Sequence, residues 1–574
     1  MLIAKKHAYT IIAILSLLSS KQSNSVFNLS ETIKIGSSYV KQRTQFGKIL
    51  VNALWGYTTQ ENTQYMLIEK KLDQAYRNSL TSDQNTQNHV TALKTAIINS
   101  PTIDIKPEDF LLGASSSAYQ NEGGLDETSA CARFYKAKGL PTAQDSLDFY
   151  HRYESDIEQM SNELHINAYR ISLAWNRIEP QPGVYNKEEI QYYKNVITTL
   201  LDHGITPVVV FHHYDIPCWF EDLGGFEKAE NGHHFKNFCT YTYKILAKEL
   251  GECLISMCNA PEGPAFKGYF TGECTPGEKD NLHKTHTVIA NMYYELVDTA
   301  LEIRKIHKQL AKIDPTIKAP RIGTQLNILP LDPYCTSRMN WKERLKTTLG
   351  CHIASYVQTG GTYTFLVTGE YRIFTPQADF MKQAKGANVY RYHPHAYEAF
   401  DWIGVNIYSN NFLNGFQRIN GKELVEEDEE RYTDNSNYRN YPEGIYRAVQ
   451  MIAENVTIPL GKLRNKDGKP LPIIITENGI ATKDDEKRNR YFQRALCTIT
   501  ELIKDEYNVI GYLPWTSHDN YEWPTKDNPE GFNSKCYGFF AVNYDKNSPD
   551  YLKRTLKKGS RYYAEFAKEF FNIA

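Results

Sequence analysis

Eight apolar, β-rich runs recur along the chain from about residue 101, and they constrain the fold more than any other feature. Stretches with the apolar spacing of a helix lie between them, as at 187–203 and 281–312. Strands that alternate with helices predict βαβ units and a parallel sheet, and eight such units predict a (β/α)8 barrel, an α/β fold. The runs are 110–114, 168–175, 207–211, 253–258, 322–329, 402–408, 473–476 and 509–515.

The repeating units are longer than those of a minimal barrel, so long loops must extend from it. The two largest candidates lie at 331–400 and 409–450. An open doubly wound sheet is the alternative, and one that binds nucleotides usually carries a glycine-rich loop after its first strand. The first run, Phe110-Leu-Leu-Gly-Ala-Ser, continues without a G-x-G-x-x-G loop, and no G-x-x-x-x-G-K-[ST] motif occurs. The barrel is therefore favoured.

Residues 1–25 resemble a secretory signal peptide. Lys5 and Lys6 precede an apolar run at 8–18, and the small residues Ser23 and Ser25 follow it. A basic start, a short apolar run and a small-x-small site are typical of export signals, and the run is short for a membrane span. We therefore expect a secreted or periplasmic protein with no integral membrane span after signal removal. An uncleaved anchor and a plain N-terminal helix are the alternatives.

Residues 26–100 have a different composition from the rest of the chain. They are rich in Ser, Thr, Asn and Gln, and apolar residues with helical spacing occur at 65–76. This pattern predicts an N-terminal extension that is helical or partly disordered, followed by the barrel domain at 101–574.

Charge and cysteine content exclude several classes of function. The formal net charge of −2 provides no global field that would attract nucleic acid. The ten cysteines form no C-x-x-C pair, so neither a zinc site nor a disulfide framework is expected. Cys253 and Cys258 flank an apolar run and are interpreted as buried thiols. We expect no metal and no cofactor, and the sequence indicates no oligomeric state.

Polar side chains stand where the predicted strands end. Functional residues of such barrels gather at the C-terminal ends of the strands, so these side chains are expected at one mouth. Each alone has an ordinary explanation as a cap or a core residue, but together they provide amides, carboxylates, an imidazole and indoles. That mixture suits a polyhydroxylated ligand. They are Gln120, Arg170, His213, Asn259, Asn327, Asn406, Tyr408, Glu477, Trp515, Glu522 and Trp523.

Six motifs follow one another in the order of a known family. They are Phe110-Leu-Leu-Gly-Ala-Ser-Ser-Ser-Ala-Tyr-Gln-Asn-Glu-Gly, Tyr150-His-Arg-Tyr-Glu-Ser-Asp-Ile, Tyr169-Arg-Ile-Ser-Leu-Ala-Trp, His213-Tyr-Asp-Ile-Pro, Ile475-Thr-Glu-Asn-Gly and Trp515-Thr-Ser-His-Asp-Asn-Tyr-Glu-Trp. Through them the region from about 107 to 568 resembles glycoside hydrolase family 1, the retaining β-glucosidase-like enzymes.

The resemblance implies a (β/α)8 barrel whose pocket holds one β-linked sugar unit of a small β-glycoside or oligosaccharide. It implies that Glu477 is the nucleophile, and that Arg170 and Tyr408 orient Glu477 and hold it ionised. The sugar pocket would be lined by Gln120, His213, Asn259, Asn406, Trp515, Glu522 and Trp523.

The sequence departs from the family at the second catalytic carboxylate. The family has Asn-Glu-Pro at the end of the fourth strand, whereas this chain has Asn259-Ala260-Pro261. Ala260 therefore occupies the acid/base position, and a retaining mechanism needs a carboxylate there to protonate the leaving oxygen and then deprotonate water. A smaller departure is Tyr214, which stands where the family has Trp.

Several hypotheses follow from the missing carboxylate. Glu262 could replace it if the chain stays extended, because residues i and i+2 then point to the same side, but it would be displaced by roughly 6–7 Å. We favour a retaining β-glycosidase acting on O- or S-linked β-glycosides, impaired or dependent on a good leaving group. The alternatives are a catalytically inactive carbohydrate-binding barrel and a transglycosidase.

Overall fold

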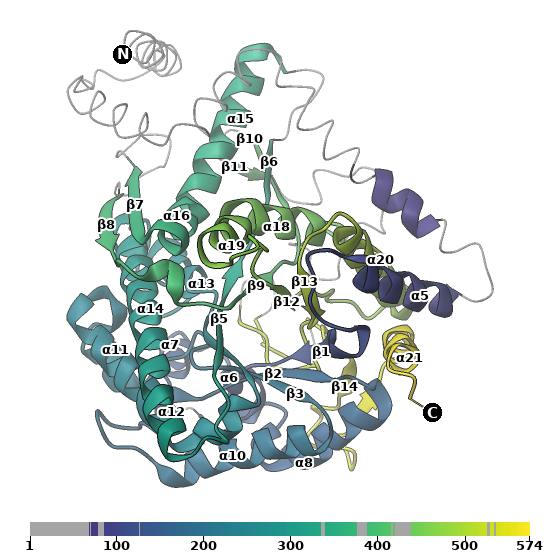
Figure 1. Ribbon diagram of the computed structural model, residues 1–574. Coiled ribbons are helices and arrows are strands. Elements are labelled where there is room, and N and C mark those ends of the chain that lie inside the picture. Colours follow the sequence, from purple (N-terminus) through teal and green to yellow (C-terminus); the bar gives the residue numbers. More distant parts are fainter. Residues whose placement is uncertain are drawn as a thin grey trace. The chain divides into compact units, whose positions relative to one another are not determined.

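Eight parallel strands close into a barrel in the order β1-β13-β12-β9-β5-β4-β3-β2 (Figure 1). The structure is a computed structural model that describes residues 68, 70–77, 85–125, 127–333, 339–375, 387–414, 417–419, 438–524, 529–532 and 535–573. Each barrel strand falls on one of the eight predicted runs, so the (β/α)8 prediction is confirmed. The strands are β1 Leu111–Ser115, β2 Ala168–Ser172, β3 Thr206–Val210, β4 Leu254–Asn259, β5 Arg321–Asn327, β9 Trp402–Asn406, β12 Ile473–Glu477 and β13 Val509–Tyr512.

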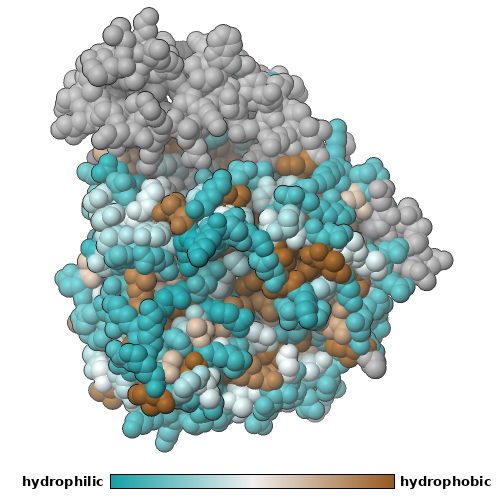
Figure 2. Space-filling model, in the orientation of Figure 1, coloured by the Kyte–Doolittle hydropathy of each residue, from teal (hydrophilic) through white to brown (hydrophobic). Residues whose placement is uncertain are grey.

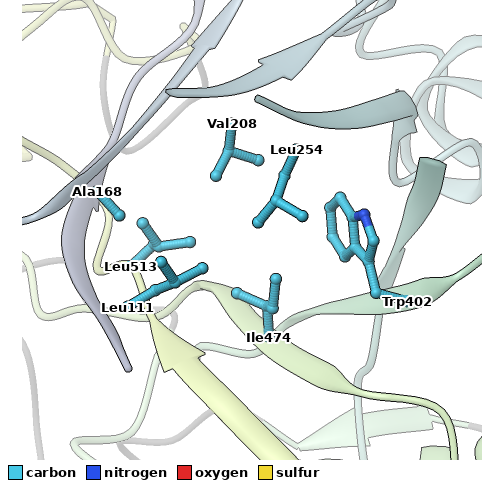
Figure 3. Close-up of a cluster of buried hydrophobic side chains, with 7 residues drawn as sticks. All are labelled: Leu111, Ala168, Val208, Leu254, Trp402, Ile474 and Leu513. Carbon is cyan, nitrogen blue, oxygen red and sulfur yellow. The ribbon is translucent and has the colours of Figure 1, made fainter. Parts of the chain in front are cut away.

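One end of the barrel interior is filled by apolar side chains that point toward one another (Figure 3). Space for the largest of them comes from Gly323, since a Cβ there would overlap the Trp402 indole. This packed layer makes the interior a core and leaves the opposite, C-terminal end of the strands for a site. The layer consists of Leu111, Ala168, Val208, Leu254, Trp402, Ile474 and Leu513.

Helices surround the strands and cover their outer faces (Figure 1). Their starts follow the sequence, because Asn186 caps α10 by accepting from the amides of Glu188 and Glu189, and Asp484 caps α20 in the same way. The two helices predicted from spacing are confirmed as α10 Lys187–Asp202 and α14 Leu282–Ile313. The others around the barrel include α7 Ala130–Ala137, α8 Phe149–Gln159, α12 Gly232–Gly251, α13 Glu262–Phe266, α16 Gly361–Thr368, α18 Gly444–Ile452, α19 Ile458–Arg464, α20 Asp485–Lys504 and α21 Arg561–Phe570.

The long insertions carry secondary structure of their own in their described parts. Strands β7 Glu370–Thr375 and β8 Ala387–Tyr392 pair as an antiparallel ribbon. A separate small unit contains a three-stranded sheet in the order β11-β10-β6, with α15 Trp341–Ser355 against it. Its strands are β6 Leu331–Pro333, β10 Asn411–Asn414 and β11 Gln417–Ile419.

Part of the predicted N-terminal extension is a helix, α5 Asn85–Asn99, that packs on α20 and α21. Leu93 and Ile97 of α5 are buried there, and His89 contacts both Tyr562 of α21 and Cys497 of α20. The predicted signal peptide at 1–25 lies outside the described residues.

The surface seen from the side of Figure 1 is largely hydrophilic over the described residues, with separate hydrophobic patches (Figure 2). Among the described helices, none combines the length and the apolar character that a membrane crossing requires. Cys253 and Cys258 are buried thiols, as expected.

Candidate active site

Glu477 is the last residue of β12 and its carboxylate is held by two donors. The Arg170 guanidinium donates to Oε1 at 2.6 Å, and the Tyr408 hydroxyl donates to Oε2 at 2.7 Å. Arg170 is fully buried and Glu477 is only 7% exposed, so the pair is shielded from water but still reachable from the mouth. Burial, followed by the nearby Glu477 charge, raises the pKa of Tyr408 well above its ordinary value, so this phenol remains a donor.

A network of amides continues from Arg170 across the mouth. The second terminal nitrogen of the Arg170 guanidinium donates to Asn259 Oδ1 at 3.1 Å and to Gln325 Oε1 at 2.8 Å. Asn406 donates to the same Asn259 oxygen at 2.9 Å, while the Thr476 hydroxyl donates to Asn406 Oδ1 at 2.7 Å. These bonds fix the guanidinium from both sides, so Arg170 has little freedom to leave Glu477.

The strand register contributes to this arrangement. Asn259 lies opposite Gln325 after an irregularity in the pairing of β4 with β5, and Glu477 lies opposite Asn406 after a similar shift between β12 and β9. Such bulges re-aim side chains and are common next to active sites.

His213 and Trp515 form another part of the wall. Asn259 donates its amide hydrogen to His213 Nε2 at 3.2 Å, so Nε2 is the accepting nitrogen and the neutral ring carries its proton on Nδ1. Burial and the adjacent Arg170 lower the pKa of His213 well below its ordinary value, which keeps the ring neutral. The imidazole and the Trp515 indole lie 6.0 Å apart between ring centres.

Glu522 is the second carboxylate at the mouth. The Trp515 indole N–H donates to its Oε1 at 2.7 Å. Burial raises the pKa of Glu522 to about 7, partly offset by that hydrogen bond. A carboxyl group with such a pKa can accept hydrogen bonds from sugar hydroxyls or donate hydrogen bonds to them.

Trp523 belongs to a stack of aromatic rings that continues the wall. Its ring is 5.4 Å from Tyr119 and 5.5 Å from Tyr214, stacked with both. The Lys267 ammonium lies over the faces of Tyr214 and Trp523, at 5.3 and 6.0 Å from the ring centres. Flat apolar surface of this kind is what the C–H faces of sugar rings pack against.

Gln120 is buried and fixed at the edge of this stack. Its side-chain amide donates to the Tyr521 carbonyl at 2.9 Å, and its side-chain oxygen accepts from Ser117 at 2.9 Å. It therefore lies beside the segment that carries Glu522 and Trp523. Asn327 ends β5 opposite Asn406, at the same end of the barrel.

Ala260 follows β4 with an unusual backbone conformation. Its φ of 47° lies in the left-handed region, and its amide donates to the Gln325 carbonyl at 3.0 Å. Helix α13 begins two residues later, so the extended geometry that would aim Glu262 at the mouth is absent.

Glu262 instead lies in the layer between the barrel and the outer helices. Its Oε1 accepts from Tyr293 of α14 at 2.6 Å and from Thr362 of α16 at 3.1 Å. Burial raises its pKa. The hypothesis that Glu262 faces the mouth is therefore wrong, because the chain turns at Pro261 where continued extension was assumed.

The structure brings all the predicted site residues to one end of the barrel, and it adds others. Sequence reasoning does not find Gln325, because this residue lies inside a strand. It includes Tyr119 only as part of a motif, and nothing in the segment of Lys267 indicates the position of that residue. Within the described residues no group of three or more His, Cys, Asp or Glu side chains could hold a metal. A carboxylate bound by a buried cation, in a mouth of amides and indoles, is suited to attack an electrophilic carbon of a sugar.

Comparisons with known proteins place this arrangement in a class. The sequence profile of glycosyl hydrolase family 1 matches residues 103–570. β-Glucosidase A of Acetivibrio thermocellus is 27% identical over 503 residues, which cover 80% of this chain and 98% of that protein. The Zea mays 4-hydroxy-7-methoxy-3-oxo-3,4-dihydro-2H-1,4-benzoxazin-2-yl glucoside β-D-glucosidase 1 is 28% identical over 82% of this chain and 86% of its own length.

Solved structures agree with the sequence comparison. A β-glycosidase from Pyrococcus horikoshii superposes with a TM-score of 0.62 at 25% identity, covering 81% of this chain and 95% of its own. The family 1 β-glucosidase of Thermotoga maritima has the same fold, with a TM-score of 0.63 at 22% identity over 80% of this chain and 98% of its own. The fold and the site define a barrel glycoside hydrolase that acts on O-glycosyl bonds. The chain belongs to glycosyl hydrolase family 1.

Proposed function

We propose that the chain is a retaining β-glycosidase in which Glu477 attacks the anomeric carbon of a β-glycoside and Ala260 stands in the acid/base position. The observation that carries the proposal is the carboxylate of Glu477 held by Arg170 and Tyr408 at the barrel mouth. A protein that only bound sugar would have no physical need for a buried carboxylate oriented in this way. The names of the curated relatives make a β-glucoside the substrate to test first.

The proposed reaction has two steps of unequal difficulty. In the first, Glu477 forms a bond to the anomeric carbon while the glycosidic bond breaks and its electron pair leaves with the aglycone oxygen or sulfur. In the second, water must displace Glu477, and water is a poor nucleophile without a base. General acid–base catalysis typically contributes about 10²–10⁴-fold, so the missing carboxylate should slow both steps.

The amide and aromatic groups of the mouth support binding of the sugar. Asn259, His213 and Gln120 supply neutral hydrogen-bonding groups, and Trp515 and Trp523 supply flat apolar surface. Glu522 would bind hydroxyl groups of the same sugar ring. Because most of these groups are already bonded to each other, the pocket is preorganised before a ligand enters.

The test is turnover of a dinitrophenyl β-glucoside, whose aglycone leaves without a proton, with and without azide. Azide attacks without being deprotonated, so it should speed release at least about tenfold if the lost base is limiting. We expect a slow steady state after a burst of phenolate, and a β-glucosyl azide product when azide is present. Glu477→Gln is the matched control and should remove the burst and the azide product.

Two results would overturn the proposal. One is that a 2-fluoro glycoside forms no covalent adduct on the intact protein, as judged by mass. The other is that azide changes neither rate nor product. Either result, together with retained glucose binding, would favour the carbohydrate-binding barrel. A burst with glycosyl transfer to added alcohols in place of water would favour the transglycosidase.

A further inference from the structure

Tyr214 lies in the segment after β3, and its side chain reaches the segment after the neighbouring strand β4. Its backbone φ of 65° is in the left-handed region, which is unfavourable for a non-glycine residue. Such conformations persist where the surroundings impose them, and they gather at functional sites.

The Tyr214 hydroxyl packs directly on the first turn of α13. A Cβ added at Gly263 would overlap this hydroxyl, so only glycine allows the approach. The Gly263 amide donates to the Ala260 carbonyl at 2.9 Å, which closes one turn between the two residues. The phenol therefore lies within a helical turn of Ala260, the position assigned to the missing acid/base.

Two neighbouring side chains pack against the ring of Tyr214. It stacks on Trp523 at 5.5 Å, and the Lys267 ammonium lies 5.3 Å from its centre. Burial raises the pKa of Tyr214 well above its ordinary value, and Glu477 is the charged group that contributes most after burial. The phenol therefore keeps its proton and remains a donor.

We propose that the Tyr214 hydroxyl donates a hydrogen bond to the leaving oxygen of the bound glycoside and so partly replaces the missing acid. This inference rests on the proposed glycosidase function and specifies how the first step proceeds. As Glu477 bonds to the anomeric carbon, the electron pair of the breaking C–O bond moves to the aglycone oxygen. Tyr214 stabilises that developing anion and retains its own proton, and the released alkoxide or phenolate takes a proton from water.

The same chemistry limits what Tyr214 can do afterwards. A phenol that stays protonated cannot remove a proton from water, so it gives no help to the second step. The hydroxyl should therefore act on formation of the glycosyl-enzyme and leave its breakdown unchanged. The two steps can be measured separately, which makes the inference testable.

The experiment compares Tyr214→Phe with the unmodified chain on aryl β-glucosides whose phenols span a wide range of acidity. A hydrogen bond to a charged group corresponds to about 10- to 100-fold in rate, so glucosides of weakly acidic phenols should react that much more slowly. The dinitrophenyl glucoside should change about threefold or less, since its leaving group needs little help. The dependence of rate on phenol acidity should become steeper, which a purely structural change would not cause.

A matched control variant keeps the result interpretable. Tyr294→Phe removes a phenol from α14, where its ring contacts His393, and it should match the unmodified chain.

Three outcomes overturn the inference. If the rate depends equally on phenol acidity in Tyr214→Phe and in the unmodified chain, the inference is contradicted and the glycosidase function stands. A uniform loss of rate on every glucoside would assign Tyr214 a packing role only. Absence of both adduct and turnover in the unmodified chain would remove the inference and the proposed function together.

Discussion

Tyr293 donates a hydrogen bond to Glu262 Oε1 at 2.6 Å, and this contact turns the only carboxylate near Ala260 in sequence away from the barrel mouth. Thr362 donates to the same oxygen from a second helix. Glu262 thus ties α13 to α14 and α16 and is a structural residue of the helix layer.

Replacement of Glu262 by Gln should therefore leave catalysis nearly unchanged. Gln keeps the oxygen that accepts from Tyr293 and Thr362, so the loop after β4 stays in place. We expect kcat/KM for aryl glucosides to stay within about twofold, against the 10²–10⁴-fold loss typical of removing an acid/base residue. Steady-state rates with and without azide measure this, and a large loss of turnover in Glu262→Gln that azide restores would assign Glu262 a catalytic role after all.

Tyr408→Phe should slow the formation of the glycosyl-enzyme. The change removes the donor to Glu477 Oε2 and leaves Arg170 on Oε1, so the carboxylate gains freedom to rotate. The loss should be about 10- to 100-fold, the range for a hydrogen bond to a charged group. The rate of labelling by a 2-fluoro glycoside, followed by mass, reports this step alone, and unchanged labelling would contradict the role given to Tyr408.

Ala260→Glu should restore ordinary glycosidase behaviour. A carboxylate at this position could protonate the leaving oxygen and then activate water, so turnover of alkyl glucosides should rise by about 10²–10⁴-fold. Azide should then no longer accelerate release. Ala260→Gln has the same size without the proton chemistry and serves as the control, and an equal gain in both variants would show that space rather than acid–base chemistry was missing.

Glu522 predicts a dependence of stability on pH. Its pKa rises from 4.5 to about 7 on folding, so the folded state holds a proton that the unfolded state releases. The contribution is fully present below pH 4.5 and is lost as pH rises through about 7, a difference of roughly 3 kcal/mol in the free energy of unfolding. Glu522→Gln cannot titrate, so guanidinium unfolding across this range should show a flatter pH profile than the unmodified chain. Parallel profiles would contradict the assignment.

Export is a prediction that rests on the sequence alone. Lys5, Lys6 and the apolar run at 8–18 are expected to direct the chain out of the cytoplasm. N-terminal sequencing of the native protein, with cell fractionation, should find a start after the run and the protein outside the cytosol. Cytosolic protein that begins at Met1 would count against it.

The sequence contained enough information for the barrel but only part of the site. The strands were predictable because each is a short apolar run buried on both faces, and Glu477 was predictable because it ends the run Ile473–Ile475. Arg170 and Tyr408 were candidates because they lie at strand ends. Their role as partners of Glu477 came from family resemblance, because no local pattern joins residues 307 and 69 positions apart.

The remaining site residues depend on features that local patterns do not encode. Glu262 was misplaced because alternation applies only to extended chain, and the left-handed Ala260 ends the strand before it. Lys267 and Trp523 are in contact because the loops after β4 and β13 lie at the same mouth of the folded barrel. Gln325 points inward from the middle of a strand, where burial rather than chemistry is the usual interpretation.

Helix α5 extends the packed barrel domain beyond the N-terminal boundary that the family match suggests. The family match starts at residue 103, yet Leu93 and Ile97 already lie buried against α20 and α21. Leu72 is also buried, and the Tyr76 hydroxyl donates to Gln493 of α20 at 3.2 Å. A cut before residue 70 would leave these contacts intact, whereas a cut at 103 would leave an apolar strip on two barrel helices open to aggregation. The N-terminal border of the family match therefore differs from the N-terminal border of the packed structure. A stable preparation of the enzyme must include the packed N-terminal residues.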